Sequence, residues 1–215
     1  LPIILELSGA NNIDTHLESV KKGMLHKSED ISFALDEKYI LIFKTMDSTE
    51  KRMFAEYKYI LAEYLQGTLQ WMQREGIVCR FYIGTFQNSF LKYHYAYRHC
   101  RWLEKNTKSR HNSVYFYDHI CDFVQSIVPE DELDHIFNVY GKLLSEDMQN
   151  SCKELINTLV DTNFNTAKAS EALYMHKNTF LYQYNKIRDV LNVNPQSSYE
   201  DKWFLIFLQL FLKNK

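Results

Sequence analysis

The order of apolar patterns in the first 118 residues most constrains what this chain can fold into. Short apolar runs typical of strands alternate there with longer segments that carry apolar residues at helical spacing, which predicts the order β-α-β-β-α-β-α-β. Such alternation places helices on the faces of a sheet, and β-α-β-β-α-β is the order of a ferredoxin-like unit. We therefore expect the chain to belong to the α+β class and to begin with a ferredoxin-like α/β domain.

No strand pattern follows residue 118, which predicts a helical second half. The predicted strands are residues 1–7, 31–35, 39–43, 78–86 and 113–117, and the predicted helices among them start at residue 13 and span 49–75 and 89–105. Pro129 and the three acids after it suit a helix start, because proline fits the first turn and acids complement the helix dipole. We expect an α/β domain at 1–118, a helical connector at 119–150 and an all-α domain at 151–215.

The charge distribution allows nucleic-acid binding only through a local patch. The whole chain has a formal net charge of -2, whereas residues 151–215 hold eight Lys and Arg against six Asp and Glu. The longest apolar stretch, 203–212, is about half of what a membrane-spanning helix needs. The four cysteines form no CxxC pair, which fits reduced thiols in a cytoplasmic protein.

The C-terminal part has the pattern of a helix-turn-helix. An apolar helical stripe ends near Asn163, and Asn165 or Thr166 can cap a short helix that reaches Leu173. A tight turn at 174–176 then leads to a third helix at 177–191. Two helices joined by a tight turn, with the second longer and more polar, are typical of this DNA-binding motif.

Helical spacing divides the third helix into two faces. The apolar arc, which we expect in the core, holds Phe180, Tyr184, Ile187 and Leu191. The opposite arc holds Asn178, Thr179, Tyr182, Asn185 and Lys186, with Lys177 at its start. Asn can pair with adenine, and Lys, Thr and Tyr can contact phosphates, so this arc suits a major groove. An ordinary solvated helix face would show the same periodicity.

Residues 154–212 resemble the C-terminal helix-turn-helix of the carbohydrate-diacid regulator (CdaR/PucR) family. The third helix of that family carries a pattern like H-x-N-T-x-x-Y-R, and this chain supplies His176, Asn178, Thr179 and Tyr182. An Ala-rich second helix and Asp201 before the closing apolar helix also match. The resemblance implies a sequence-specific transcription regulator whose third helix reads double-stranded DNA.

The sequence departs from the family where the third helix is usually basic. Lys177, Leu181 and Gln183 stand where the family commonly has Arg, so an exposed Leu181 would either touch a thymine methyl or weaken phosphate contact. The predicted DNA-contacting residues are Thr166, His176, Lys177, Asn178, Thr179, Tyr182, Gln183 and Lys186.

In the same regulators, the region before the helix-turn-helix looks like a degenerate nucleotide-cyclase domain of the GGDEF type, which residues 1–118 resemble in element order. An active cyclase would carry glycine and acids at the hairpin near residues 36–39, but this chain has Asp-Glu-Lys-Tyr there. Gly84 is a lone glycine of the kind that usually serves packing. We expect no catalytic residues, no metal and no cofactor, and hence no enzyme.

Such regulators bind DNA as homodimers or higher homo-oligomers, because one motif contacts few base pairs. The resemblance further implies that a small-molecule effector binds a region upstream of residue 1, and we expect no membrane partner.

Two alternatives stay open. The α/β domain could sense a nucleotide or small molecule, with the helical tail serving oligomerisation, or the chain could be an interaction scaffold. The aromatic run 93–99 would then supply a ligand or dimer surface, although core packing explains it as well.

Overall fold

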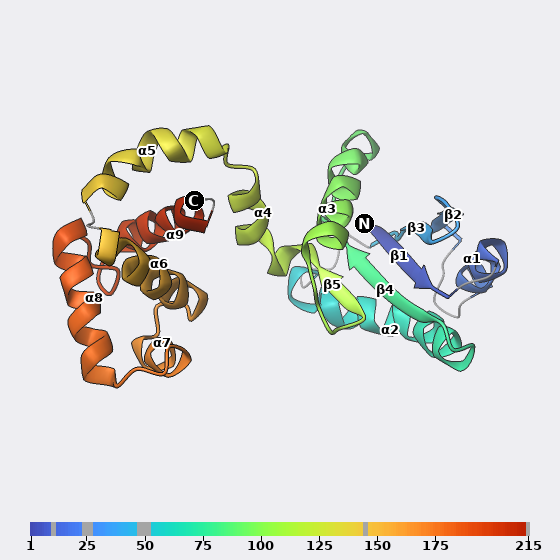
Figure 1. Cartoon of the computed structure of the whole chain (residues 1–215). Helices are drawn as coiled ribbons and strands as arrows, with labels where there is room; N and C mark the ends of the chain where they lie inside the picture. The colour runs from blue at the N-terminus through green and yellow to red at the C-terminus, as the bar shows by residue number, and fades with distance from the viewer. Residues whose placement is uncertain (10–11, 23–27, 47–52, 144–145, 214–215) are drawn as a thin grey trace. The chain divides into compact units, whose positions relative to one another are not determined.

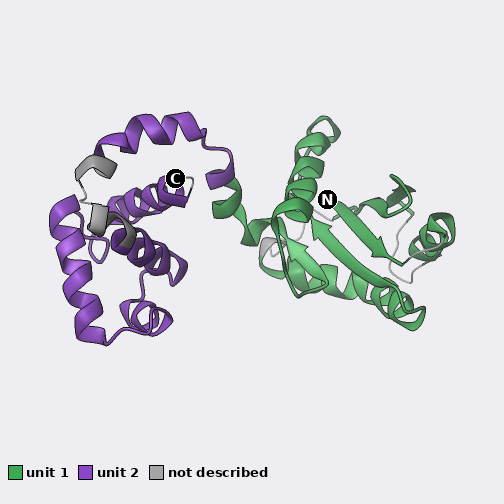
Figure 2. Cartoon of the chain, viewed as in Figure 1, with its two compact units in different colours: residues 1–123 green, residues 124–215 purple. Residues whose placement is uncertain are grey.

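The computed structural model describes residues 1–9, 12–22, 28–46, 53–143 and 146–213. The chain divides into two compact units, residues 1–123 and residues 124–215 (Figure 2). The first unit is mixed α/β and the second is helical, as the sequence predicts at the level of fold class.

The first unit contains a five-stranded sheet. In chain order its elements are β1 Pro2–Ser8, α1 Ile13–Lys22, β2 Ile31–Ala34, β3 Tyr39–Phe43, α2 Met53–Arg74, β4 Val78–Ile83, the 3-10 turn η1 Phe90–Lys92, α3 Tyr93–Asn106, β5 Ser113–Tyr115, the 3-10 turn η2 Phe116–Asp118 and α4 Ile120–Ser126 (Figure 1). The boundary between the two units falls within α4, after residue 123. The spatial order of the strands is β2-β3-β1-β4-β5. Only β4 and β5 are parallel, and the other neighbours are antiparallel.

The register aligns one row of buried side chains across the sheet. Leu41 of β3 lies opposite Ile4 of β1, which lies opposite Tyr82 of β4, which pairs in turn with Val114 of β5. This row packs beneath α3. Residues at odd positions of β1, such as Ile3 and Leu5, face the other way, because successive side chains of a strand alternate.

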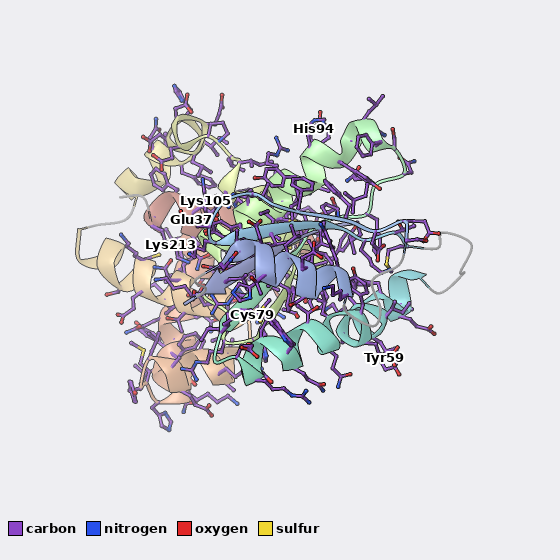
Figure 3. The ribbon with its side chains drawn as sticks, turned by 90° about the vertical axis from the view of Figure 1, so that its right-hand side faces the viewer. Glu37, Tyr59, Cys79, His94, Lys105 and Lys213 are labelled. Carbon is purple, nitrogen blue, oxygen red and sulfur yellow. The ribbon has the colours of Figure 1, made fainter. Side chains whose placement is uncertain are left out.

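Helices therefore cover both faces of the sheet. The face with Ile3 packs against α1 and α2, while the face with Ile4 packs against α3. In Figure 3 the side chains of Tyr59 on α2 and His94 on α3 point outward, away from the sheet. The amphipathic periodicity that predicts these helices also orients them, since their apolar sides are the ones that bury.

Gly84 lies where α3 approaches the end of β4 most closely. A Cβ atom at Gly84 would stand 2.5 Å from the carbonyl oxygen of Ala96 and 2.8 Å from Sγ of Cys100. Both distances are too short for a real Cβ contact, so this glycine serves helix–sheet packing.

Several predicted segments differ from the structure in where they end or divide. The predicted strand 78–86 ends at Ile83, whose pairing with Ile3 is the last between β4 and β1. The predicted strand 113–117 ends at Tyr115, because the next three residues, Phe116–Asp118, form the 3-10 turn η2. The predicted helix 89–105 is divided into η1 and α3. Residues 49–52 of the predicted helix 49–75 lie outside the described residues.

The aromatic side chains of residues 93–99 lie in different environments, some packed and some exposed. Tyr93 stacks on Phe43 of β3 at a centroid distance of 5.3 Å, and His99 stacks on Phe116 at 4.1 Å. Tyr97 packs against the core beneath α3, whereas Tyr95 is 46% exposed. The run thus supplies core and rim packing on α3.

The second unit is a cluster of helices around one core. Its elements are α5 Glu130–Leu143, α6 Glu146–Asp161, α7 Thr166–Ala172, α8 Lys177–Leu191 and α9 Tyr199–Lys213. Helix α9 packs on both α5 and α6, and α7 packs on α6 and α8. Residues 119–150, expected to form a helical connector, hold α4, α5 and the start of α6. Leu133 and Phe137 of α5 are buried in the same core as α9.

The predicted apolar helix at 203–212 lies within α9 and is buried along one side. Buried Gln209 donates a hydrogen bond to the carbonyl oxygen of Asn157 at 3.1 Å and another to the Asp161 carboxylate at 2.9 Å, which ties α9 to α6. None of the described helices is both long and apolar enough to span a membrane.

The described cysteines are free thiols, of which three are buried. Cys79 lies in the core beneath α1 and α2, Cys100 is on the buried side of α3, and Cys152 lies in the core of the second unit. Cys121 on α4 is exposed.

Candidate nucleic-acid interface

Two left-handed residues followed by a cap form the turn from α6 to α7. Asn163 and Phe164 have φ values of 54° and 59°. The Asn165 side chain then accepts hydrogen bonds from the second and third N–H groups of α7, both at 3.1 Å. Of the two cap candidates in the sequence, Asn165 is therefore the N-cap, and Thr166 is the first residue of the helix.

The turn from α7 to α8 ends in a histidine cap. Tyr174, with φ of 53°, is 99% exposed, and the next N–H, that of Met175, donates to the carbonyl oxygen of Ser170 at 2.9 Å. Nδ1 of His176 accepts a hydrogen bond from the N–H of Asn178 at 3.3 Å. In that tautomer Nε2 carries the proton, so the atom of His176 left for another partner is a donor.

The buried face of α8 determines which side of the helix is turned to solvent. Phe180, Tyr184, Ile187 and Leu191 are buried in the core of the second unit, as their spacing predicts. Burial also raises the pKa of Tyr184 above its usual value. Because all four side chains point into the core, the opposite face of α8 is turned to solvent along its whole length.

The outer face of α8 carries most of the predicted contact residues. His176, Lys177, Asn178, Thr179, Tyr182 and Lys186 are exposed, whereas Thr166 and Gln183 are half-buried. Tyr182 is 72% exposed. Within the described residues, neither Lys177 nor Lys186 takes part in an ion pair. Both ammonium groups are thus free to meet an external anion.

Leu181 is not exposed, contrary to the expectation from the family resemblance. It is half-buried and packs against the core of the second unit. Its position about 90° from the buried arc explains this, since a side chain at that angle lies along the edge of the helix contact. A direct contact of Leu181 with a thymine methyl group does not fit this placement.

Two exposed residues of this surface were missed by the sequence reasoning. Asp189 lies on the outer face of α8, seven positions after Tyr182, and helical spacing alone could have found it. Tyr174 occupies a left-handed position that glycine usually takes, so no sequence signal marks it. Asp189 adds negative charge at the end of the face, opposite in sign to the lysines.

The joint between α8 and α9 holds the outer face in place. Asn192 adopts φ of 52° as the C-cap of α8. The Asp201 carboxylate accepts a hydrogen bond from the N–H of Asn194 at 2.6 Å, and the N–H of Asp201 donates to Oγ of Ser198 at 3.1 Å. Asp201, which the sequence comparison singles out, thus connects the end of α8 to the first turn of α9.

Hydrogen bonds within the turn stabilise the hairpin between β2 and β3. The Asp36 carboxylate accepts hydrogen bonds from the N–H groups of Lys38 and Tyr39, at 2.8 and 3.0 Å. Nζ of Lys38 lies 2.6 Å from the Glu6 carboxylate, which also accepts a hydrogen bond from the Tyr82 hydroxyl at 2.6 Å. The carboxylates of Asp36 and Glu6 are therefore engaged by the protein's own donors.

These contacts shift the titration of the groups involved. Burial alone would raise the pKa of Glu6, but hydrogen bonds from Lys38 and Tyr82 lower it below its usual value. The hydrogen bond with Glu6 raises the pKa of Lys38. The described part of the chain contains no cluster of three or more His, Cys, Asp or Glu side chains that could hold a metal ion.

Comparison with known proteins gives a match for the second unit. A comparison with curated proteins found no match to the chain. The family model of the PucR C-terminal helix-turn-helix domain matches residues 153–210. This range runs from within α6 to within α9 and contains both turns and the whole of α8. The helical C-terminal region is thus similar to the DNA-binding domain of a family of transcription regulators.

Proposed function

We propose that this chain is a sequence-specific, DNA-binding transcription regulator of the PucR/CdaR type. The observation that carries the proposal is the match of residues 153–210 to the PucR helix-turn-helix domain, in a structure whose α8 turns an uncovered polar face to solvent. In a helix-turn-helix, the second helix of the motif lies in the major groove and its N-terminal residues contact the bases.

The chemistry of α8 suggests a division of roles. Asn178 can form a bidentate pair with adenine, and Thr179 can contact a phosphate or a thymine methyl group. Lys177 and Lys186 suit phosphates on either side of the groove, with Tyr182 between them. His176, Gln183 and Thr166 lie beside this face, where we expect contacts to the DNA backbone.

For the first unit we propose a ferredoxin-like fold of the degenerate GGDEF type without cyclase activity. The order β2-β3-β1-β4 with antiparallel neighbours, and α1 and α2 on one face, supports the ferredoxin-like assignment. The hairpin that would carry the cyclase signature holds Asp36 as a turn cap. We retain 1–118 and 151–215 as the proposed α/β and DNA-binding domains, with residues 119–150 between them.

We also propose that the chain binds DNA as a homodimer or higher homo-oligomer. One α8 reaches only a few base pairs, and its outer face carries two lysines and one aspartate, so electrostatic affinity from a single copy is low. Two copies would read half-sites separated by about one turn of DNA, roughly 34 Å.

The test is selection of genomic DNA fragments by the chain, followed by titration of the selected site at several salt concentrations. Lys177→Ala and Lys186→Ala should each weaken binding uniformly and reduce the slope of log K against log salt by about 1. Asn178→Ala should instead relax the base preference at one position of each half-site, at a cost of about 1 to 3 kcal/mol for the correct base.

Lys213→Ala is the matched control, because Lys213 is an exposed lysine at the end of α9 and lies 3.5 Å from the Asp161 carboxylate. It should leave both the affinity and the salt slope unchanged. Equal effects of Lys213→Ala and Lys177→Ala would mean that α8 is not the reading helix. Failure to enrich any sequence would contradict the proposed function itself.

A further inference from the structure

A pocket in the first unit lies between α1 and α2. It has a volume of about 460 Å³ and is lined by Ser19, Lys22, Gly67, Thr68, Gln70, Trp71 and Arg74. The α2 residues recur at helical spacing, so they form one continuous strip of that helix. None of the predicted DNA-contacting residues belongs to this pocket.

The charged residues of the pocket are both cations. Lys22 and Arg74 are exposed, and no ion pair among the described residues uses either of them. The neighbouring Lys21 differs, because its Nζ lies 3.4 Å from the Glu18 carboxylate. Each cation closes a helix and complements its dipole, which explains a positive charge at each end. That role does not require the two cations to meet at one pocket.

Trp71 supplies a flat apolar wall. Its ring is half-buried and packs edge-on against His16 at a centroid distance of 5.5 Å, and His16 itself is buried. The ring is thus held from one side. A tryptophan face next to two cations that have no ion pair among the described residues suits a ligand with both a flat ring and a negative charge.

Gly67 is the second unusual feature of the pocket lining. It lies in the interior of α2, where glycine is less favourable than alanine by up to about 1 kcal/mol. A Cβ atom at Gly67 would meet nothing within 4 Å, in contrast to the crowded Gly84. Packing among the described residues therefore gives no reason for this glycine, whereas a ligand that approaches the α2 backbone would.

We propose that this pocket binds a small anionic molecule with a flat ring. Lys22 and Arg74 would hold the anionic group, Trp71 would stack on the ring, and Gly67 would leave room for the ligand above α2. This site goes beyond the proposed DNA-binding function and does not depend on it. It would make the first unit a ligand-binding domain as well as a structural one.

The experiment titrates the whole chain with phenyl phosphate, inorganic phosphate and phenol at constant ionic strength, by calorimetry and by tryptophan fluorescence. Phenyl phosphate combines ring and charge, so it should bind at least tenfold more tightly than either fragment probe and quench part of the emission. Trp71→Phe should remove that quenching while calorimetry still detects binding.

Charge variants then locate the site. Lys22→Gln and Arg74→Gln should each weaken phenyl phosphate binding at least threefold, and the double variant at least tenfold. Lys21→Gln is the matched control, because it removes a neighbouring charge that lies outside the pocket. Equal loss of phenyl phosphate affinity in Lys21→Gln and Lys22→Gln would mean that the net surface charge, and not the pocket, attracts the probe. That result would overturn the proposal.

Gly67→Ala separates ligand binding from folding, because its two effects have opposite directions. Alanine should raise the midpoint of thermal unfolding, since it favours the helix and meets no other group. The same methyl group should weaken phenyl phosphate binding at least threefold by occupying the pocket floor. Unchanged affinity in a more stable Gly67→Ala protein would show that the pocket holds no ligand above Gly67 and would overturn the proposal.

Discussion

The carboxylate of Asp201 accepts a hydrogen bond from the backbone N–H of Asn194 at 2.6 Å, and this contact joins the end of α8 to the first turn of α9. We expect Asp201→Ala to lower the free energy of unfolding of the second unit by about 1 to 2 kcal/mol, because it leaves a half-buried N–H without its acceptor. Asp201→Asn should cost less, since the amide oxygen can still accept. Amide hydrogen exchange of α8 and α9 measures both effects, and equal exchange in all three proteins would contradict this role.

Tyr174 should cost the protein stability in its present conformation. A left-handed backbone costs a residue with a Cβ about 1 to 2 kcal/mol, and the exposed ring gains no packing in return. Tyr174→Gly should therefore raise the free energy of unfolding by about 1 kcal/mol. Unchanged thermal unfolding of the variant would mean that the turn carries no such strain.

The same substitution tests the orientation of the motif on DNA. Tyr174 lies just before the N-terminus of α8, where the proposed docking brings the turn near the DNA backbone. If its hydroxyl contacts a phosphate there, Tyr174→Gly should weaken DNA binding about threefold even as it stabilises the fold. Titration of the selected site checks this, and tighter or equal binding would place the turn away from DNA.

Asp189 should oppose DNA binding, since its carboxylate lies on the same outer face of α8 as Lys186. Asp189→Asn should strengthen binding several-fold at low salt, with a smaller gain at high salt because the repulsion is screened. Glu154→Gln is the matched control, because it neutralises an exposed acid of α6 in the same unit. A similar gain from Glu154→Gln would point to net charge and not to the α8 face.

The Glu6–Lys38 pair predicts a pH-dependent contribution to the stability of the first unit. The pKa of Glu6 is lower in the folded protein than its ordinary value of 4.5. Its ionised form therefore stabilises the fold above that value, and the contribution disappears as the pH falls through the lowered pKa.

Glu6→Gln tests this sign. At pH 7 it should lower the free energy of unfolding by about 1 kcal/mol, a modest value because Lys38 is half-exposed. The difference between the two proteins should shrink as the pH is lowered toward 3. A difference that stays constant with pH would mean that the glutamate charge adds nothing to folding.

Sequence periodicity predicted the elements of the first unit well, because each strand and helix buries one side. It could not predict where strands end, since β4 stops at Ile83 although the N–H of the next residue, Gly84, still donates to the carbonyl oxygen of Pro2 at 3.0 Å. It also could not predict that α5 packs against α9, because the apolar side of a helix does not say which core it joins.

The candidate interface shows the same division. The buried and exposed arcs of α8 follow from spacing alone, so Phe180 and Asn178 lie as predicted. The expectation that Leu181 is exposed is wrong, because its angle around the helix axis puts it on the boundary of the two arcs. The cap formed by Nδ1 of His176 depends on the backbone geometry of the turn, which no pattern of residue types encodes.

Each unit contains a buried thiol whose reactivity depends on the opening of that unit. Burial raises the pKa of Cys79 and of Cys152 to about 11, so neither reacts as a thiolate at neutral pH while its unit stays closed. Cys79 is buried in the first unit and Cys152 in the second. Alkylation rates at the two positions would therefore report the opening of the two units separately, within one chain and without any introduced cysteine.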